Sequence, residues 1–533
     1  MDDVIVIGSG AAGLAAATAA AAAGARTTVL EATATVGGTT AMSGGVAWVP
    51  ANGRSEALGF PDDVDSALTY LRGLALGDVD DALVERFVRT GAEVLDAVEK
   101  TTPIRWRVIA YPDYHCGREG GREGGRSLEP DPIDLPAEHD DLVRRPASWR
   151  VRATQDELIR GTFDAEVGRQ RERDGVQTMG RALTAGQTLG ALDAGVRILV
   201  EHRATRLLVE DGRVVGVETP DGPMRGRVVL ASGGFERDPR LRVSFLRAPI
   251  DALTGGPGAR GDGLRMALAV GAELGNMSEA WWAPTVRLPG SEVDGEPLDF
   301  LLLSERGRPG TLMVDRNGRR FCNEAQNYND VGRALHGFDP GGFRFDRDPA
   351  WLIVDAAYRA RFPIGPVLPG EDGAADWVTA PDVAGLAAGM GVPVDTLTAT
   401  LERYGADAES GVDRDFGRGA SAYDRFVGDR GAAHPNLRPL EGPYTAVPVR
   451  AGTLGTKGGP RIDGDGRVRH QDGGTIPGLY AAGNAAANPF GQAAPAAAPA
   501  AAPAAPAANN PFAGATAPPA AGQVGLAAPT QMM

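Results

Sequence analysis

The pattern of apolar positions predicts a parallel sheet at the start of the chain. Residues 4–7 (VIVI) form a short, continuous apolar run, as expected of a strand that is buried on both faces. An alanine-rich stretch at 11–23 predicts a helix, and residues 27–30 form a second apolar strand that ends at Glu31. Together these segments make one complete βαβ unit.

The rest of the chain alternates between similar units and a region of different character. Residues 62–100 and 177–192 have helical spacing, and residues 227–231 form another buried strand. The region 281–435 is richer in aromatic residues and loops. Sheet-like sequence resumes at 444–449 and ends at 478–484.

These patterns predict an α/β fold: a Rossmann-type domain with an inserted α+β domain. We expect residues 1–280 to form the first part of the nucleotide-binding domain, and 281–435 to form the inserted substrate domain. The return segment is 436–492. Residues 493–533 are mostly Ala and Pro and carry no charge, so we expect a disordered tail.

Composition narrows the function classes. The net charge of −15 over 533 residues disfavours nucleic acid as a partner, because phosphate binding needs a basic surface. Cys116 and Cys322 form no CxxC pair, and the six histidines are scattered without an HExxH motif, so we expect no metal site. No targeting or transmembrane segment is visible, which predicts a cytoplasmic protein.

The first βαβ unit carries a dinucleotide-binding pattern. Gly8 would permit a tight turn, Gly10 would let the backbone approach a pyrophosphate, and Gly13 would allow the helix to pack closely on the strand. The phosphates would then lie at the helix N-terminus. Glu31 follows where a carboxylate can bind a ribose hydroxyl. Further glycines close to the ribose strand favour FAD over NAD. The predicted cofactor residues are Gly8, Gly10, Ala11, Ala12, Gly13, Glu31, Gly37, Gly38, Thr39, Thr40, Ser43, Gly44, Gly45, Ala204, Ser232, Gly233, Gly483 and Asn484.

Several longer segments show a family resemblance. They are VGGTTAMSGGVAWVP (36–50), YPDYH (111–115), GRSLEP (125–130), LASGGFE (230–236), NMSEAWW (276–282), VDRNGRRFCNEAQNYND (314–330), YTAVPVRAGTLGTKGG (444–459) and LYAAGNAAANPFG (479–491). The chain resembles the 3-ketosteroid Δ1-dehydrogenase family, within the fumarate-reductase-type flavoproteins, from residue 1 to about 491.

The resemblance implies an FAD-dependent 1,2-dehydrogenation of a small apolar ketone such as a 3-ketosteroid. A hydride would pass to the flavin, and a tyrosine would take the proton next to the ketone. Matching positions imply that Tyr328 is the base and Tyr114 its partner, with Tyr111 as the second choice for that partner. The sequence does not identify the electron acceptor that reoxidises the flavin.

The chain departs from this family after residue 491. The family has a tyrosine that holds the substrate carbonyl, and Ala494 stands in its place. One alternative is therefore an impaired or inactive flavoprotein. Another is a fumarate-reductase-like enzyme, although that group usually has a His-Thr-Met-Gly-Gly turn where residues 455–459 read GTKGG. Lys457 in this turn is either a flavin-facing residue or a solvated charge.

Overall fold

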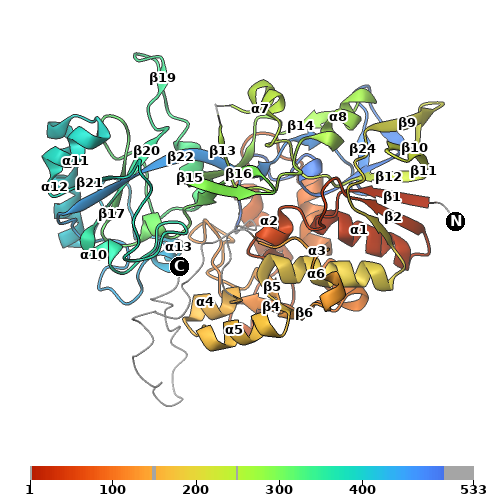
Figure 1. Ribbon diagram of the computed structural model, residues 1–533, viewed down its shortest axis with the longest axis horizontal. Coiled ribbons are helices and arrows are strands. Elements are labelled where there is room, and N and C mark those ends of the chain that lie inside the picture. The colour runs from red at the N-terminus through yellow and green to blue at the C-terminus, as the bar shows by residue number, and fades with distance from the viewer. Residues whose placement is uncertain (1–2, 147–151, 248–249, 497–533) are drawn as a thin grey trace.

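The computed structural model describes residues 3–146, 152–247 and 250–496. The molecule is elongated, with one lobe built around the N-terminal strands and a second lobe at the opposite end (Figure 1). Each lobe has its own sheet. The predicted mixed α/β class is confirmed, whereas the predicted domain boundaries stay a prediction.

The sheet of the first lobe joins segments that are far apart in the sequence. Its strand order is β24-β25-β12-β1-β2-β8, and β1 is parallel to both of its neighbours, with Val4 opposite Thr27 and Arg227. The strands are β24 (Arg467–Arg469), β25 (Thr475–Ala481), β12 (Arg227–Leu230), β1 (Asp3–Ile7), β2 (Arg26–Leu30) and β8 (Arg197–Leu199). The beginning, middle and end of the chain therefore meet in one sheet.

Steric limits explain the sharp turn between β1 and helix α1 (Ala11–Ala22). Gly8 has a φ of +103°, and a Cβ at this position would lie 2.4 Å from the carbonyl oxygen of Ala231. A Cβ on Gly13 would lie 2.0 Å from the carbonyl oxygen of Gly8. Only glycine allows the helix to begin this close to the strand.

Helices and short strands cover the sheet of the first lobe. The stretch 62–100 forms two helices instead of one, because Gly77 adopts a φ of +80° and the Asp80 side chain caps the second helix by accepting from Leu83 N. The elements are α2 (Val64–Gly73), α3 (Asp81–Thr101), β3 (Ala47–Trp48), β4 (Trp106–Ile109), β5 (Ser127–Pro130), β6 (Ile133–Asp134), α4 (Gln155–Arg160), α5 (Ala165–Arg173), β7 (Val176–Gln177), α6 (Met179–Asp193), β9 (Arg206–Glu210), β10 (Arg213–Thr219), β11 (Gly222–Arg225), α7 (Pro239–Phe245), α8 (Asp262–Ala269), β14 (Leu274–Gly275) and β23 (Gly459–Pro460).

The second lobe contains a mainly antiparallel sheet. Its path is β16-β15-β22-β20-β17, and the long strands β15 and β22 pair with each other. Figure 1 shows β22 running from this lobe back toward the first. The elements are β13 (Ala252–Leu253), β15 (Ala280–Val293), β16 (Glu296–Leu301), β17 (Thr311–Val314), α9 (Tyr328–Ala334), β18 (Phe338–Asp339), β19 (Arg344–Phe345), β20 (Ala350–Asp355), α10 (Ala356–Arg359), β21 (Val378–Ala380), α11 (Val383–Met390), α12 (Val394–Ser410), α13 (Ala422–Val427) and β22 (Tyr444–Thr456).

The end of the described chain is packed against the fold. Residues 493–496 belong to the segment that the sequence predicted as a disordered tail, yet Ala494 is 1% and Ala496 3% exposed. The Tyr70 hydroxyl donates to the carbonyl of Pro495 at 2.6 Å. The remainder of the predicted tail, 497–533, lies outside the described residues.

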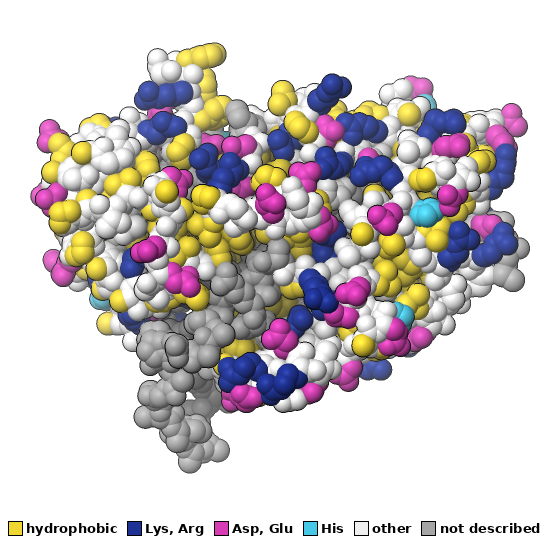
Figure 2. Space-filling model, in the orientation of Figure 1, with side chains coloured by type: hydrophobic (Ala, Val, Ile, Leu, Met, Phe, Trp, Pro, Cys, Tyr) yellow, Lys and Arg dark blue, Asp and Glu magenta, His cyan; other side chains and the backbone are white. Residues whose placement is uncertain are grey.

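The surface is mixed in charge. On the face shown in Figure 2, basic and acidic side chains are interspersed and no large basic patch is present. Among the described helices, none is long and apolar enough to cross a membrane.

Candidate active site

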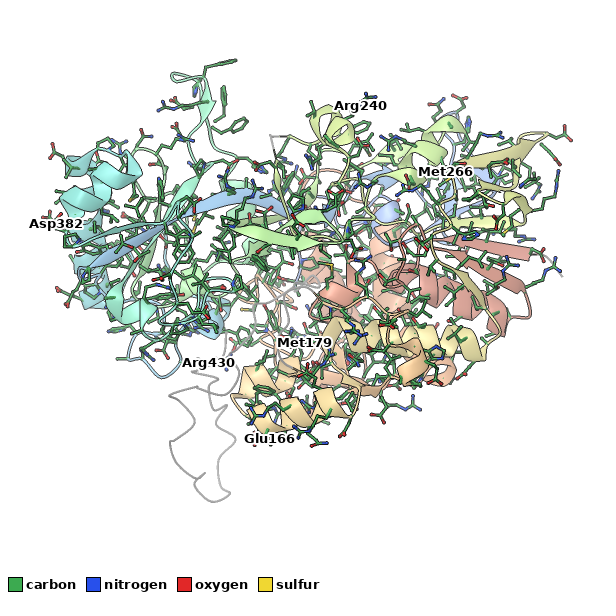
Figure 3. The ribbon with its side chains drawn as sticks, viewed as in Figure 1. Glu166, Met179, Arg240, Met266, Asp382 and Arg430 are labelled. Carbon is green, nitrogen blue, oxygen red and sulfur yellow. The ribbon has the colours of Figure 1, made fainter. Side chains whose placement is uncertain are left out.

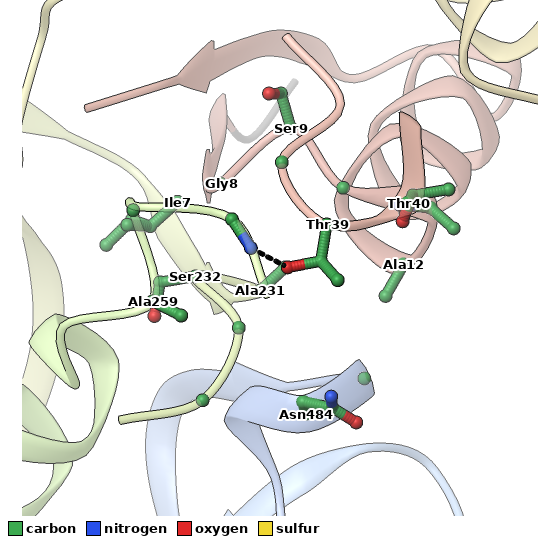
Figure 4. A pocket seen from close by; sticks show the side chains of 18 of the residues that line it. Ile7, Gly8, Ser9, Ala12, Thr39, Thr40, Ala231, Ser232, Ala259 and Asn484 are labelled. Atoms are coloured by element: carbon green, nitrogen blue, oxygen red, sulfur yellow. Dashed lines mark hydrogen bonds between the residues drawn. The ribbon is translucent and has the colours of Figure 1, made fainter. Parts of the chain in front are cut away.

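A cavity of about 420 Å³ opens at the carboxyl ends of β1, β2 and β12. This is the edge of a parallel sheet at which ligands of α/β proteins bind. Figure 4 shows the turn at Gly8 and Ser9 on one side, and Asn484 on the opposite side. The predicted residues that line the cavity are Gly8, Gly10, Ala11, Ala12, Glu31, Gly38, Thr39, Thr40, Ala204, Ser232, Gly233, Gly483 and Asn484.

The other predicted cofactor residues lie behind the cavity wall. None of them lines the cavity. Gly13 packs against a residue that does, since a Cβ on it would lie 2.0 Å from the carbonyl oxygen of Gly8, whereas Gly45 packs against the backbone of Met179. The Gly37 amide donates to the carbonyl of Ser9 at 3.1 Å. This group consists of Gly13, Gly37, Ser43, Gly44 and Gly45.

Glu31 is held in a fixed position at the end of β2. Its Oε2 accepts from the Ser9 hydroxyl at 2.6 Å, and its Oε1 accepts from the Thr33 amide at 2.8 Å. The side chain is 7% exposed and lines the cavity. A carboxylate has further lone pairs, so Glu31 can still accept from a ribose hydroxyl.

The cavity wall fits a dinucleotide at two glycines. A Cβ on Gly38 would meet no protein atom within 4 Å, and one on Gly233 would meet only the Ala259 Cβ, at 4.0 Å. Both glycines line the cavity, so the backbone there is open to an incoming group. Gly10 precedes α1, whose N-terminus offers free amides and a positive dipole end to phosphates.

One end of the cavity is lined by aromatic side chains, none of which was among the site residues predicted from the sequence. The Trp48 and Phe87 rings stack at 6.1 Å with an angle of 10°, and Phe490 meets Phe87 edge-on at 5.3 Å. Trp281 and Leu454 complete this end. Flat apolar walls of this kind suit a flavin ring and an apolar substrate.

The opposite end of the cavity is polar. Arg203 pairs with Asp262 at 2.5 Å, and Arg144 Nη2 donates to the Thr33 hydroxyl at 3.1 Å. These lining residues were also missed, because nothing in their local sequence distinguishes them from ordinary surface charges. Additional lining residues that were not predicted individually are Ala32, Thr33, Val46, His202, Ala231, Gly234, Glu236, Gly256, Gly258, Ala259, Pro495 and Ala496.

The three predicted catalytic tyrosines belong to one buried cluster. The Tyr114 ring lies 5.6 Å from the Tyr328 ring and 5.2 Å from that of Tyr423, measured between centroids and close to perpendicular in each case. Tyr111 lies 6.4 Å from Tyr423. Leu454 and Ala494 pack into the same cluster, and Leu454 also lines the large cavity. The sequence missed Tyr423, which comes from the distant helix α13.

Burial raises the pKa of two of these phenols and so disfavours their ionised form. It raises the pKa of Tyr111 to about 12 and that of Tyr114 well above its usual value, and the neighbouring phenols raise the pKa of Tyr114 further. The Tyr114 hydroxyl lies near Tyr328 but makes no hydrogen bond of good geometry in the described structure.

A buried cation opposes this effect. The Arg306 guanidinium is 1% exposed and its charge lowers the pKa of Tyr111 and Tyr423. Its Nε and Nη1 donate to backbone carbonyls, including that of Leu302 at 2.9 Å, while Nη2 has no partner in the described structure.

Lys457 is buried, which decides between the two predicted alternatives against a solvated charge. It is 0% exposed, and its ammonium donates to the carbonyls of Gln492 and Ala493 at 3.1 and 2.8 Å. The segment that carries Ala494 is thereby fixed at the cavity wall.

The described residues contain no group of three or more His, Cys, Asp or Glu side chains that could hold a metal ion.

His115, the neighbour of Tyr114 in the sequence, is close to Asp330, with Nε2 at 3.2 Å from a carboxylate oxygen.

Comparison with known proteins identifies the class of this site. The sequence profile of the FAD binding domain family matches residues 3–499. The chain is 37% identical to 3-oxosteroid 1-dehydrogenase of Mycolicibacterium smegmatis, over 92% of this chain and 93% of the relative. It is 36% identical to 4-oxocyclohexanecarboxylate 2-dehydrogenase of Sinomonas cyclohexanicum, over 92% and 88%.

A solved structure agrees over nearly the whole chain. The 3-ketosteroid Δ1-dehydrogenase of Sterolibacterium denitrificans, solved with 1,4-androstadiene-3,17-dione, superposes with a TM-score of 0.85 at 30% identity, covering 93% of this chain and 95% of the other. The chain therefore belongs to the FAD-binding flavoproteins of the 3-ketosteroid Δ1-dehydrogenase family. It is an FAD-dependent dehydrogenase of the ketosteroid and cyclic-ketone type.

Proposed function

We propose that this enzyme introduces a double bond between the carbon next to the carbonyl of a 3-ketosteroid or a similar cyclic ketone and the following ring carbon, the C1–C2 bond in a steroid. The reaction removes a hydride from one carbon and a proton from the carbon beside the ketone. Bound FAD supplies the acceptor for the hydride. The protein must supply the base, an apolar site and the orientation of the ring.

We assign the base to Tyr328, which takes the proton from the carbon next to the ketone. The observation that supports this choice is the buried cluster in which Tyr328 and Tyr114 lie side by side, at 5.6 Å between ring centroids, next to Leu454 of the cavity wall. Tyr328 acts as a phenolate when it takes this proton, and Tyr114 stabilises that phenolate by donating a hydrogen bond to its oxygen. Tyr111 lies one phenol further away, behind Tyr423.

The experiment is turnover of a Tyr328→Phe variant with a cyclic ketone. Loss of a positioned base lowers kcat by about 10²–10⁴. Tyr404→Phe is the matched control, because Tyr404 is also a buried phenol but packs in the core of the second lobe. Undiminished turnover of the Tyr328→Phe enzyme would exclude this tyrosine as the base.

Ala494 supports a second candidate, a flavoprotein with impaired catalysis. This side chain, 1% exposed, packs in the tyrosine cluster and offers no hydroxyl to a substrate carbonyl. The two candidates differ in one spectrum. Anaerobic addition of 4-androstene-3,17-dione or 4-oxocyclohexanecarboxylate bleaches the flavin of an active enzyme and leaves that of an impaired enzyme oxidised.

A further inference from the structure

A second, smaller cavity lies beside the tyrosine cluster. It has a volume of about 40 Å³ and is lined by Tyr111, Ile159 of α4, Ser304, Arg308, Phe426 of α13 and Arg430. Figure 3 shows Arg430 on the side of the second lobe that faces α4 and α5. Tyr111 belongs both to this cavity and to the cluster that contains Tyr114 and Tyr328.

Arg308 is a buried cation without an acid partner. It is 5% exposed, and its Nε and Nη1 have no hydrogen-bond partner in the described structure. Its guanidinium lies 4.4 Å from the centre of the Phe362 ring. Two acids, Glu305 and Asp429, are near enough to raise the pKa of Arg308, but the net effect of burial lowers it.

Both of these acids are engaged elsewhere. Asp429 accepts from Arg361 at 2.8 Å, and Glu305 Oε1 accepts from the Gly365 amide at 3.3 Å. Among the described residues, neither acid forms an ion pair with Arg308. The charges of the two acids offset that of Arg308 only in part, because burial still lowers its pKa, so the guanidinium keeps unused donors for an anion.

Two further groups in the cavity are also free to bind an anion. Arg430 is half-buried and lies 4.5 Å from the centre of the Phe426 ring, and within the described structure it makes no ion pair or hydrogen bond. The Ser304 hydroxyl is buried and has no partner there either. Two guanidinium groups and a hydroxyl thus converge on one small cavity without an acid among its lining residues.

We propose that this cavity binds the carboxylate of the substrate, so that the enzyme acts on a ring ketone that carries an acid group away from its carbonyl. The inference rests on the proposed function and deepens it. Arginines match the geometry of a carboxylate, and Ser304 can donate a third hydrogen bond. The anion would bind the unused donors of Arg308. Tyr111 both lines this cavity and belongs to the tyrosine cluster, and Phe426 lines the cavity and packs against that cluster.

Binding is tested without catalysis, on the FAD-containing enzyme. Cyclohexanecarboxylate carries the acid but no ketone, and cyclohexanecarboxamide is its neutral counterpart. We expect millimolar cyclohexanecarboxylate to raise the Tm of the wild-type enzyme, and the amide to leave it unchanged. Arg430→Gln should remove most of this shift, and Arg430→Lys should keep part of it. Arg425→Gln is the control, because Arg425 is exposed on the neighbouring helix α13 and donates to backbone carbonyls.

Kinetics then identify the kind of acid. The ratio of kcat/KM for 4-oxocyclohexanecarboxylate to that for its carboxamide should exceed about tenfold in the wild type and fall toward one in Arg308→Gln or Arg430→Gln. A steroid that carries a side-chain carboxylate, compared with neutral 4-androstene-3,17-dione, is the second arm. Preference for the acid in either arm supports the proposal. The arm that shows the preference identifies the substrate as a monocyclic acid or as a steroid acid.

The two proposals fail in different ways. If cyclohexanecarboxylate leaves Tm unchanged, or if it acts no differently from the amide, the carboxylate site is wrong, whatever the enzyme turns over. If the acid raises Tm through Arg430 but no ring ketone bleaches the flavin, the carboxylate site stands and the proposed reaction fails. Arg430→Gln is the more reliable variant, because Arg308 is buried deeply enough for its loss to affect folding.

Discussion

The Lys457 ammonium lies 4.3 Å from the centre of the Trp281 ring. Trp281 forms part of the aromatic end of the FAD cavity, and Lys457 also donates to the carbonyls of Gln492 and Ala493. One buried side chain therefore connects the strand that forms the cavity wall with the last described segment of the chain. Cation–π contacts of desolvated groups contribute about 2 kcal/mol.

Replacing Lys457 by Met should weaken FAD binding. The change leaves the Ala493 carbonyl without its donor, at a cost of about 1–3 kcal/mol, and the Gln492 carbonyl with Arg333 alone, so it loosens the segment that carries Pro495 and Ala496 of the cavity wall. We expect the Kd for FAD, measured by flavin fluorescence, to rise about tenfold or more. Lys100→Met, at an exposed position near the end of α3, is the control. An unchanged Kd would show that the contacts of Lys457 with Trp281 and with the last described segment do not shape the cavity.

Gly10→Ala should separate folding from cofactor binding. The nearest protein atom to a Cβ at this position is the Thr40 hydroxyl at 3.6 Å, so the protein itself accommodates the methyl group. That methyl group occupies the place where the backbone approaches the phosphates. We expect an unchanged Tm of the apoprotein and a large loss of bound FAD, seen in the absorption spectrum. Gly73→Ala, whose Cβ would meet no protein atom within 4 Å, is the control and should bind FAD normally.

Tyr114→Phe should lower turnover less than Tyr328→Phe. The proposed role of Tyr114 is one hydrogen bond to the phenolate of the base, and a hydrogen bond to a charged group contributes about 1.5–3 kcal/mol, or roughly ten- to a hundredfold in kcat. Its ring packing against Tyr328 and Tyr423 is retained in phenylalanine. Single-turnover flavin reduction measures the effect. A loss as large as that of Tyr328→Phe would reverse the two assignments.

Glu236→Gln should change how stability depends on pH. Glu236 lines the cavity and is 1% exposed, and burial raises the pKa of its carboxyl to about 7 from the usual 4.5. Between these values the folded state keeps a proton that the unfolded state releases, so the contribution of Glu236 to stability falls as pH rises. The penalty is complete above pH 7. The variant escapes it because glutamine does not ionise.

The measurement is the Tm of both proteins across this range. The gain in Tm of Glu236→Gln over the wild type should be small near pH 5 and largest above pH 7. Glu93→Gln, at an exposed position on α3, should show no such trend. A gain that is independent of pH would mean that Glu236 is not the group that titrates.

The local sequence was sufficient for the βαβ unit and most of its cofactor residues. A buried strand, a glycine turn and an alanine-rich helix depend on contacts between near neighbours, such as Gly13 against Gly8. For this reason the α/β class and the FAD cofactor could be predicted, and most of the predicted residues line the cavity. The family resemblance added Tyr328 and Tyr114, which the structure brings together.

The tertiary structure alone decided the features that depend on contacts distant in sequence. Tyr423 and Arg430 come from a segment without a motif, and their positions beside the tyrosine cluster and the small cavity follow from how α13 and the chain after it pack. Burial of Lys457 and the missing acid partner of Arg308 are also invisible in the sequence. A charged residue appears the same in the sequence whether it is solvated, paired or buried, because only the folded chain determines its surroundings.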